Sequence, residues 1–229
     1  MDCETVGVRF SDARLASAWA ALVPRPALCL LESADGEIPR KETRDVAALF
    51  VDIEGCTRLC DELLPPEMNE VIERYFSCYL DVVRGAGGEV TEILGDGLVA
   101  LFERDRLEGN ARAALGAALE IQARTRTLNA RHGARHDPVT VNIGLNAGPA
   151  SVGFTRLRGR SGERWVYAAS GPVTNVAARL LTLARGGRIL TTKATADLLP
   201  AGVNGRALGP RVLRNVSAPV EVVEITPSG

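Results

Sequence analysis

From residue 46 onward, apolar residues follow strand-like and helix-like spacings in turn. The continuous apolar run at 46–51 predicts a strand buried on both faces. The amphipathic run at 66–83 predicts a helix, because a pair of prolines, 65–66, lies at its start and glycines follow it. Two further runs, 89–94 and 98–102, flank Gly95-Asp96-Gly97. An Asp-Gly pair between alternating apolar residues predicts a β-hairpin.

The second half of the chain continues this alternation. It predicts a helix at 107–128, a strand at 139–145, a polar loop at 156–164, a strand at 165–169, a helix from about 172 to 184, a strand at 188–192, and then a short helix and a terminal hairpin. The order β-α-β-β-α-β with later elements predicts an α+β fold, with a ferredoxin-like core and C-terminal additions.

The first 44 residues stand apart from this pattern, and we expect them to form a lead segment and linker. Helical periodicity covers 10–23, a short apolar run at 27–31 suits a strand, and 33–44 is polar. A packing arm or a dimer-stabilising arm is the plainest interpretation of this segment. Residues 227–229 are expected to form a short tail.

Composition narrows the classes of function. Of the 229 residues, 46% are hydrophobic, which suits a globular domain, and the net charge is only −1. We therefore expect no nucleic-acid partner and no membrane partner. The early charges of Asp2, Glu4 and Arg9 do not suit a secretory leader, and no apolar run is long enough to span a membrane. The five cysteines and two histidines complete no zinc set, so we expect a cytoplasmic protein with reduced cysteines.

Two aspartates carry the first candidate chemistry. Asp52 ends a buried strand, where a carboxylate is costly unless it is paired or bound to a cation. In a ferredoxin-like order this strand lies beside 98–102, so the hairpin tip brings Asp96 toward Asp52. Two carboxylates and a backbone carbonyl, with Ile53 as the candidate, suit Mg²⁺ or Mn²⁺. The simpler alternatives are a helix cap for Asp52 and a turn former for Asp96.

A helix supplies the second set of candidates. Asn175 and Arg179 lie four residues apart, so both project from one helical face. A guanidinium can stabilise charge that develops on a phosphoryl group, although a surface arginine is the simpler alternative for Arg179. Arg164 and Arg214 are further candidates for contacts to a polyphosphate.

Together these residues resemble the class III nucleotide cyclase catalytic domain. Residues 50–57, Phe-Val-Asp-Ile-Glu-Gly-Cys-Thr, are similar to its first metal motif, F-x-D-I-x-G-F-T. Residues 94–97, Leu-Gly-Asp-Gly, resemble its second metal motif, and 171–180 resemble its G-x-x-V-N-x-A-x-R-L helix. The likeness runs from about residue 45 to 226 and assigns that range to one catalytic domain.

The resemblance implies a head-to-tail homodimer with shared active sites, which converts a nucleoside triphosphate to its 3′,5′-cyclic monophosphate and pyrophosphate. It implies that Asp52 and Asp96 bind two divalent cations, Mg²⁺ or Mn²⁺, and that the partner subunit supplies the other groups. In that scheme Asn175 orients the ribose and Arg179 stabilises the transition state. The triphosphate would be held by Arg214, near the position of a family lysine, and by Arg164.

The two base-reading positions depart from the adenylyl pattern. Adenylyl members carry Lys where this chain has Glu92, and Asp or Thr where it has Ala168. Guanylyl members often carry Glu at the first position, so Glu92 favours GTP, while Ala168 favours no base. ATP or a pyrimidine triphosphate (UTP or CTP) remains an alternative substrate, and a non-catalytic nucleotide-binding module remains an alternative function. The GGDEF signature of diguanylate cyclases is absent.

Overall fold

The computed structural model describes residues 24–26, 41–132, 137–200 and 202–226. The chain divides into two compact units. The larger unit, residues 43–151 and 169–229, is called the body below; the smaller unit contains 1–42 and 152–168, and its segment 152–168 is called the arm. The elements predicted at 10–23 and 27–31 lie outside the described residues.

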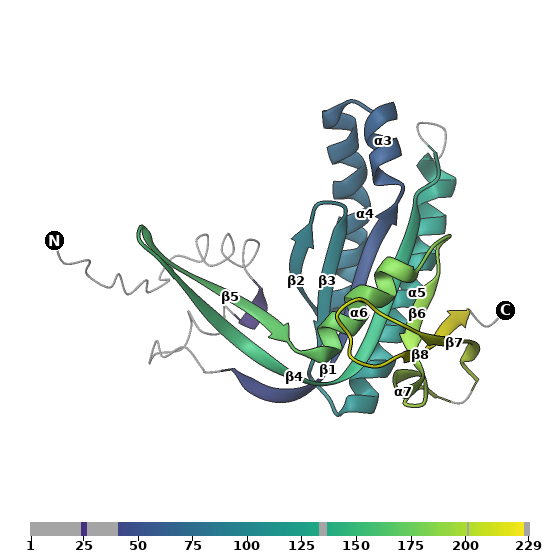
Figure 1. The fold of residues 1–229 in the computed structure, drawn as a ribbon. Helices are drawn as coiled ribbons and strands as arrows, with labels where there is room; N and C mark the ends of the chain where they lie inside the picture. The colour runs from purple at the N-terminus through teal and green to yellow at the C-terminus, as the bar shows by residue number, and fades with distance from the viewer. Residues whose placement is uncertain (1–23, 27–40, 133–136, 201, 227–229) are drawn as a thin grey trace. The chain divides into compact units, whose positions relative to one another are not determined.

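An eight-stranded mixed sheet organises the chain. Its strands run in the order β2-β3-β1-β4-β6-β8-β7, and β5 pairs with β4 (Figure 1). Their bounds are β1 Glu42–Glu54, β2 Glu89–Leu94, β3 Gly97–Phe102, β4 Thr140–Gly159, β5 Gly162–Ser170, β6 Ile189–Thr192, β7 Asn204–Arg211 and β8 Val220–Thr226. As predicted, β1 lies beside β3, and the α+β ferredoxin-like expectation is confirmed.

Helices cover both faces of the sheet in the body. They are α3 Cys56–Glu62, α4 Pro65–Gly85, α5 Leu107–His132, α6 Pro172–Leu183 and α7 Lys193–Ala196. Adjacent residues of one strand point to opposite faces. Ile189 of β6 belongs to the core beneath α4 and α5, whereas Leu190 packs with Leu180 of α6. Figure 1 shows the same arrangement, with α6 crossing in front of the sheet.

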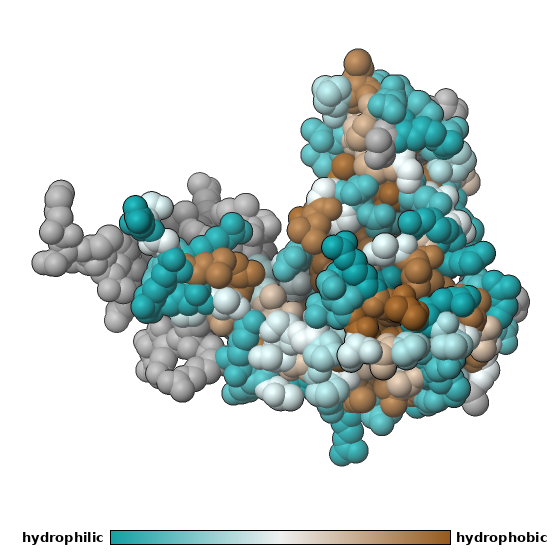
Figure 2. Space-filling view, viewed as in Figure 1, coloured by the Kyte–Doolittle hydropathy of each residue, from teal (hydrophilic) through white to brown (hydrophobic). Residues whose placement is uncertain are grey.

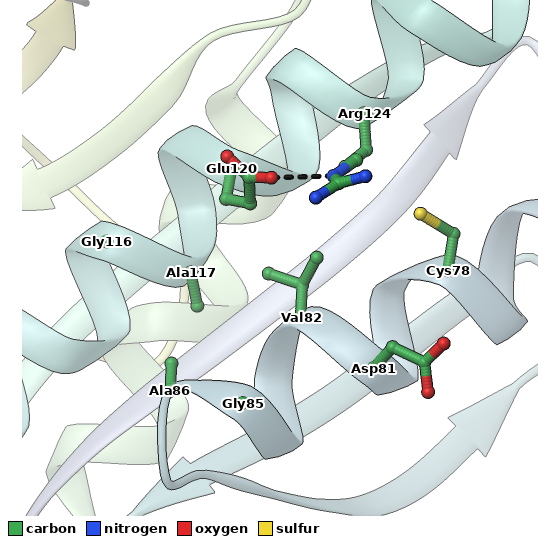
Figure 3. Close-up of a pocket in the computed structure, with 9 residues that line it drawn as sticks. All are labelled: Cys78, Asp81, Val82, Gly85, Ala86, Gly116, Ala117, Glu120 and Arg124. Atoms are coloured by element: carbon green, nitrogen blue, oxygen red, sulfur yellow. Dashed lines mark hydrogen bonds and ion pairs between the residues drawn. The ribbon is translucent and has the colours of Figure 1, made fainter.

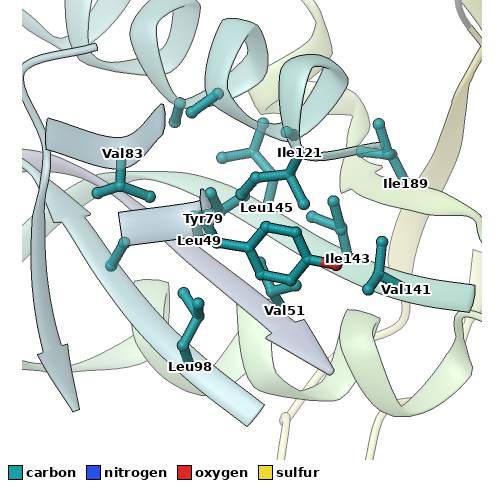
Figure 4. Packing of buried hydrophobic residues seen from close by; sticks show 14 of the residues in the cluster. Leu49, Val51, Tyr79, Val83, Leu98, Ile121, Val141, Ile143, Leu145 and Ile189 are labelled. Atoms are coloured by element: carbon teal, nitrogen blue, oxygen red, sulfur yellow. The ribbon is translucent and has the colours of Figure 1, made fainter. Parts of the chain in front are cut away.

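The main core lies between the sheet and the helix pair α4 and α5 (Figure 4). Tyr79 is fully buried there with Leu49 and Val51 of β1. A buried phenol needs a partner, and the Tyr79 hydroxyl has Thr125 Oγ1 at 2.7 Å. The part of β1 before Asp52 is therefore buried in the apolar core.

Two features of the helix and strand prediction were wrong. The chain at 156–164 is no loop, because β4 continues to Gly159 and β5 begins at Gly162. Arg164, expected in that loop, lies on β5. The helix α3, directly after the first aspartate motif, was not predicted, since seven residues give too little periodicity to detect.

Cross-strand contacts explain why the arm is a hairpin despite its polar sequence. The rings of Phe154 and Tyr167 lie 5.0 Å apart between centroids. Arg156 forms an ion pair with Glu163, and its guanidinium lies 5.4 Å from the centre of the Trp165 ring. Such cross-strand pairs stabilise the two strands even where their residues are exposed, so the apolar alternation that marks other strands is weak here.

Close packing of α6 on β4 depends on Gly144. A Cβ atom at this position would overlap the carbonyl oxygen of Ala177 and lie 2.5 Å from the nitrogen of Leu181, both in the backbone of α6. Gly144→Ala is therefore expected to lower the free energy of unfolding by about 1–3 kcal/mol, because the helix backbone must move.

Urea denaturation of the purified protein measures this effect. The control is Gly116→Ala in α5, where an added Cβ meets nothing within 4 Å. Loss of a mid-helix glycine should leave stability unchanged or raise it by about 0.5–1 kcal/mol. Equal stability of the Gly144 variant and the native protein would show that α6 does not pack this closely.

Candidate active site

The tip of the β2–β3 hairpin is fixed against the end of β1. The register of β1 with β3 places Asp52 opposite Gly97, and Ile53 N donates a hydrogen bond of 3.0 Å to the Asp96 carbonyl oxygen. The turn contains only Gly95 and Asp96, and Gly95 has a φ of 62°, the left-handed conformation that such turns require. The structure thus brings the two predicted carboxylates together.

The carboxylate pair has an unfavourable electrostatic environment, which raises the pKa of Asp52. The pKa of Asp52 is raised from 3.8 to about 6, mainly by burial and next by the charge of Asp96. The positive charge of Arg185 lowers the Asp52 pKa, and Glu54 raises it. Burial and the Asp96 carboxylate also raise the pKa of the Cys56 thiol to about 12. Asp96 therefore lies close to both Asp52 and Cys56.

These residues fit a divalent cation. Two half-buried carboxylates that repel one another are stabilised by a hard cation between them. Within the described residues no cluster of three or more His, Cys, Asp or Glu side chains forms a metal site. Asp52 and Asp96 would supply two carboxylates, and Mg²⁺ bound in this way takes its remaining oxygens from substrate phosphates, water or backbone. The Ile53 carbonyl as a ligand stays a prediction.

Asn175 and Arg179 lie on α6 as predicted, with Asn175 exposed and Arg179 half-buried. The neighbouring residues Val173, Val176 and Leu180 are buried and hold the helix on the sheet. In the described part of the chain, neither the amide nor the guanidinium forms a hydrogen bond or ion pair, with either aspartate or with any other group. Both groups are therefore open to a ligand or to a second subunit.

The remaining predicted residues are distributed over both units. Glu92 is half-buried on β2, opposite Val99 and next to a bulge in the β2–β3 register. Arg214 is exposed in the segment between β7 and β8. Ala168 and Arg164 belong to the arm, where Ala168 is half-buried and Arg164 is exposed.

Sequence reasoning missed two charged residues next to the carboxylate pair, Glu54 and Arg185. The side chain of Glu54 accepts hydrogen bonds from Gly186 N at 2.6 Å and from Asn142 Nδ2 at 3.2 Å. Arg185 precedes that glycine and acts on Asp52 through its charge. The available signal was the position of Glu54, two residues beyond Asp52 and so on the same face of β1. Nothing in the sequence places Arg185 near β1.

A hollow of about 520 Å³ lies elsewhere in the body, between α4 and α5 (Figure 3). Small residues such as Gly85 and Gly116 make room for it, and Arg124 donates a 2.6 Å hydrogen bond to Glu120 at its edge. None of the predicted site residues lines it. The chemistry argued above therefore belongs to the end of β1 and the hairpin tip, at Asp52 and Asp96, and this hollow is a separate feature.

Comparison with known proteins identifies the fold and the family. Residues 38–216 match the family model for the adenylate and guanylate cyclase catalytic domain. The chain belongs to this family. An adenylate cyclase of Anabaena cylindrica is 28% identical over 164 residues, which cover 69% of this chain and 31% of that protein. The chain thus spans only about a third of the length of this curated relative.

Two crystal structures of cyclases share the fold of this family member. The adenylyl cyclase CyaB from P. aeruginosa is 21% identical, with a TM-score of 0.76 over 83% of this chain and 98% of the other. The guanylyl cyclase Cya2 is 25% identical, with a TM-score of 0.71 over 83% and 96%. In the part of the chain that the structure describes, no helix has the length and apolar composition to cross a membrane.

Stability as a function of pH tests the environment of Asp52 in this cyclase domain. Because its pKa is raised from 3.8 to about 6 on folding, its contribution to stability is full below about pH 4 and is lost as the pH rises through about 6. In metal-free protein, Asp52→Asn should therefore gain stability over the native chain between these values. The expected gain at about pH 7 is about 1 kcal/mol, after discounting for solvent screening.

Urea denaturation with a chelator present measures this gain, and addition of Mn²⁺ should reverse the order. The native protein gains stability from a cation bound only to the folded state, whereas Asp52→Asn gains little. A pH-independent difference would contradict the raised pKa of Asp52, and equal stabilisation of both proteins by Mn²⁺ would contradict a cation site there.

Proposed function

We propose that this chain is a nucleotide cyclase domain that forms a 3′,5′-cyclic monophosphate and pyrophosphate from a nucleoside triphosphate. The observation that carries the proposal is the β1–β3 register, which pairs Asp52 with Gly97 and so holds the adjacent Asp96 beside Asp52 in a member of the cyclase family. The names of the Anabaena, CyaB and Cya2 relatives support the same activity. The cytoplasmic location predicted from the sequence stays a prediction.

Asp52 and Asp96 would hold two divalent cations, Mg²⁺ or Mn²⁺, which lower the pKa of the ribose 3′-hydroxyl and neutralise phosphate charge. In the proposed reaction, the 3′-oxygen forms a bond to the α-phosphorus, and the bond to the bridging oxygen of pyrophosphate breaks. Arg179 donates to the phosphoryl oxygens as their charge grows, and Asn175 orients the ribose. Arg214, together with Arg164, would hold the triphosphate, whose β- and γ-phosphates leave as pyrophosphate.

Shared sites in a homodimer form the next part of the proposal. Among the described residues, Asn175 and Arg179 form no hydrogen bond or ion pair with the aspartates of their own chain, so a second subunit would complete each site. Exposed apolar residues support such an interface: Ile93 and Leu94 on the hairpin are 62% and 59% exposed, and Leu183 at the end of α6 is 41% exposed. Figure 2 shows hydrophobic colour at the hairpin and over α6.

We infer GTP as the preferred substrate from Glu92. A carboxylate can accept hydrogen bonds from guanine N1 and N2, whereas adenine offers no such pair of donors at the same edge. The relatives include both adenylyl and guanylyl cyclases by name, so they do not distinguish the bases. ATP, UTP and CTP remain alternatives because Ala168 has no hydrogen-bonding side chain.

Turnover is the direct test. Purified protein is incubated separately with ATP, GTP, CTP and UTP and with Mn²⁺ or Mg²⁺, and the products are identified by mass. We expect cyclic GMP as the main product and at least a ~100-fold loss in Asp96→Asn, because a metal ligand is removed. Folded, metal-loaded protein that produces no cyclic nucleotide from any of the four would favour the non-catalytic binding module.

Mixed dimers extend this test to the shared sites. Asp52→Asn and Arg179→Ala chains are each expected to be inactive alone. Mixing them should restore part of the activity, since one of the two sites in a mixed dimer contains all its native residues. Absence of rescue in mixed dimers verified by mass would contradict a site shared between subunits.

Substitution of Glu92 tests base selection. Glu92→Lys should lower kcat/KM for GTP by about 10–100-fold, because a cation faces the donor edge of guanine. The matched control is Glu92→Gln, which keeps the size and one acceptor oxygen. Its kcat/KM for GTP should fall less than that of Glu92→Lys. Unchanged GTP turnover in Glu92→Lys would remove Glu92 from base recognition.

A further inference from the structure

The turn between α6 and β6 is held by three other elements of the body. Glu54 of β1 accepts a 2.6 Å hydrogen bond from Gly186 N. Asn142 of β4 accepts a 3.0 Å hydrogen bond from Gly187 N, and Gln122 of α5 donates to the carbonyl oxygen of Gly187. These contacts hold the backbone of Gly186 and Gly187 in place, directly after Arg185.

The backbone of this turn has a conformation that favours glycine. Gly186 and Gly187 have φ values of 67° and 76°, in the left-handed region. This shape directs Gly186 N toward the Glu54 carboxylate. Since Glu54 and Asp52 lie on the same face of β1, the turn is anchored directly beside the predicted metal site.

Arg185 is the charged residue that this anchor positions. Its Nη1 donates to the adjacent Ala184 carbonyl oxygen at 2.7 Å, and its side chain is otherwise exposed. Among the described residues it forms no ion pair, although Asp52 is close enough to experience its charge. An anchored guanidinium with free donors next to a metal site suits phosphate, which it can bind through two parallel hydrogen bonds.

We propose that Arg185 binds the triphosphate of the substrate at the site formed by Asp52 and Asp96 of its own chain, and that Glu54 is the residue that positions it. The inference rests on the proposed cyclase function and adds a phosphate ligand to it. The positive charge of Arg185 repels a divalent metal ion that arrives alone, but it attracts the phosphates of a nucleotide that arrives with the metal ion. Arg185 therefore favours binding of the cation together with the nucleotide over binding of the cation alone.

This arrangement predicts opposite effects on two ligands. Arg185→Gln should bind Mn²⁺ alone about 3-fold more tightly, because a repulsive charge is gone. The same variant should bind inorganic pyrophosphate in the presence of Mn²⁺ about 10-fold more weakly, because a charged hydrogen-bond donor is lost. Calorimetry measures both affinities without turnover. Weaker binding of both ligands would indicate a purely structural role and overturn the proposal.

Arg188→Gln is the matched control. Arg188 belongs to the same turn and is exposed, but its side chain lies 3.7 Å from Glu224 on β8. Both affinities should stay at their native values. If the native protein makes no cyclic nucleotide and binds no pyrophosphate, the proposed function fails. If the native protein makes a cyclic nucleotide and binds pyrophosphate, but Arg185→Gln has native affinities for Mn²⁺ and for pyrophosphate, only this inference fails.

A pair of Glu54 variants tests the positioning role. Glu54→Gln and Glu54→Ala remove the same charge, but glutamine keeps an oxygen that can accept from Gly186 N. Pyrophosphate should bind about 3-fold more weakly to Glu54→Ala than to Glu54→Gln, and this difference should disappear when Arg185→Gln is added. A difference that persists in the double variants would show that Glu54 does not act through Arg185.

Discussion

The pairing of β1 with β3 is the constraint on which the site depends. It places Asp52 opposite Gly97, and the Ile53 N to Asp96 O hydrogen bond then fixes the hairpin tip. A shift of one residue would turn Asp52 to the other face of the sheet and break the apolar packing of Leu49 and Val51. The core therefore excludes a slip by one residue, and the register that it favours brings the two carboxylates together.

Stability and chemistry oppose one another at the end of β1. The apolar core around Tyr79 directs the strand to a place where Asp52 is half-buried, and burial together with the charge of Asp96 raises the Asp52 pKa to about 6. Metal-free protein carries this cost at neutral pH, and a bound cation would remove it. A site that is unfavourable alone and favourable with its ligand is what preorganisation of a binding site means in energetic terms.

The sequence was sufficient for the sheet core and for the aspartate pair because each rests on a local signal. A buried apolar run predicts β1, and an Asp-Gly turn predicts the hairpin that carries Asp96. The arm was missed as a hairpin because its stabilising contacts, such as Phe154 with Tyr167, connect opposite strands and leave no periodic pattern. The proximity of Glu54 to Gly186 was invisible for a similar reason: it joins residues 132 positions apart.

The charge distribution gives these long-range contacts a functional meaning. On one chain, Asp52, Asp96 and Glu54 gather at the end of β1 with Arg185 as the nearby cation, whereas Asn175 and Arg179 lie on α6 without partners among the described residues. The α6–β6 turn connects the two groups, since it follows α6 and is hydrogen-bonded to Glu54. The position of the carboxylate group relative to α6 is therefore fixed through Gly186, by a contact within one chain.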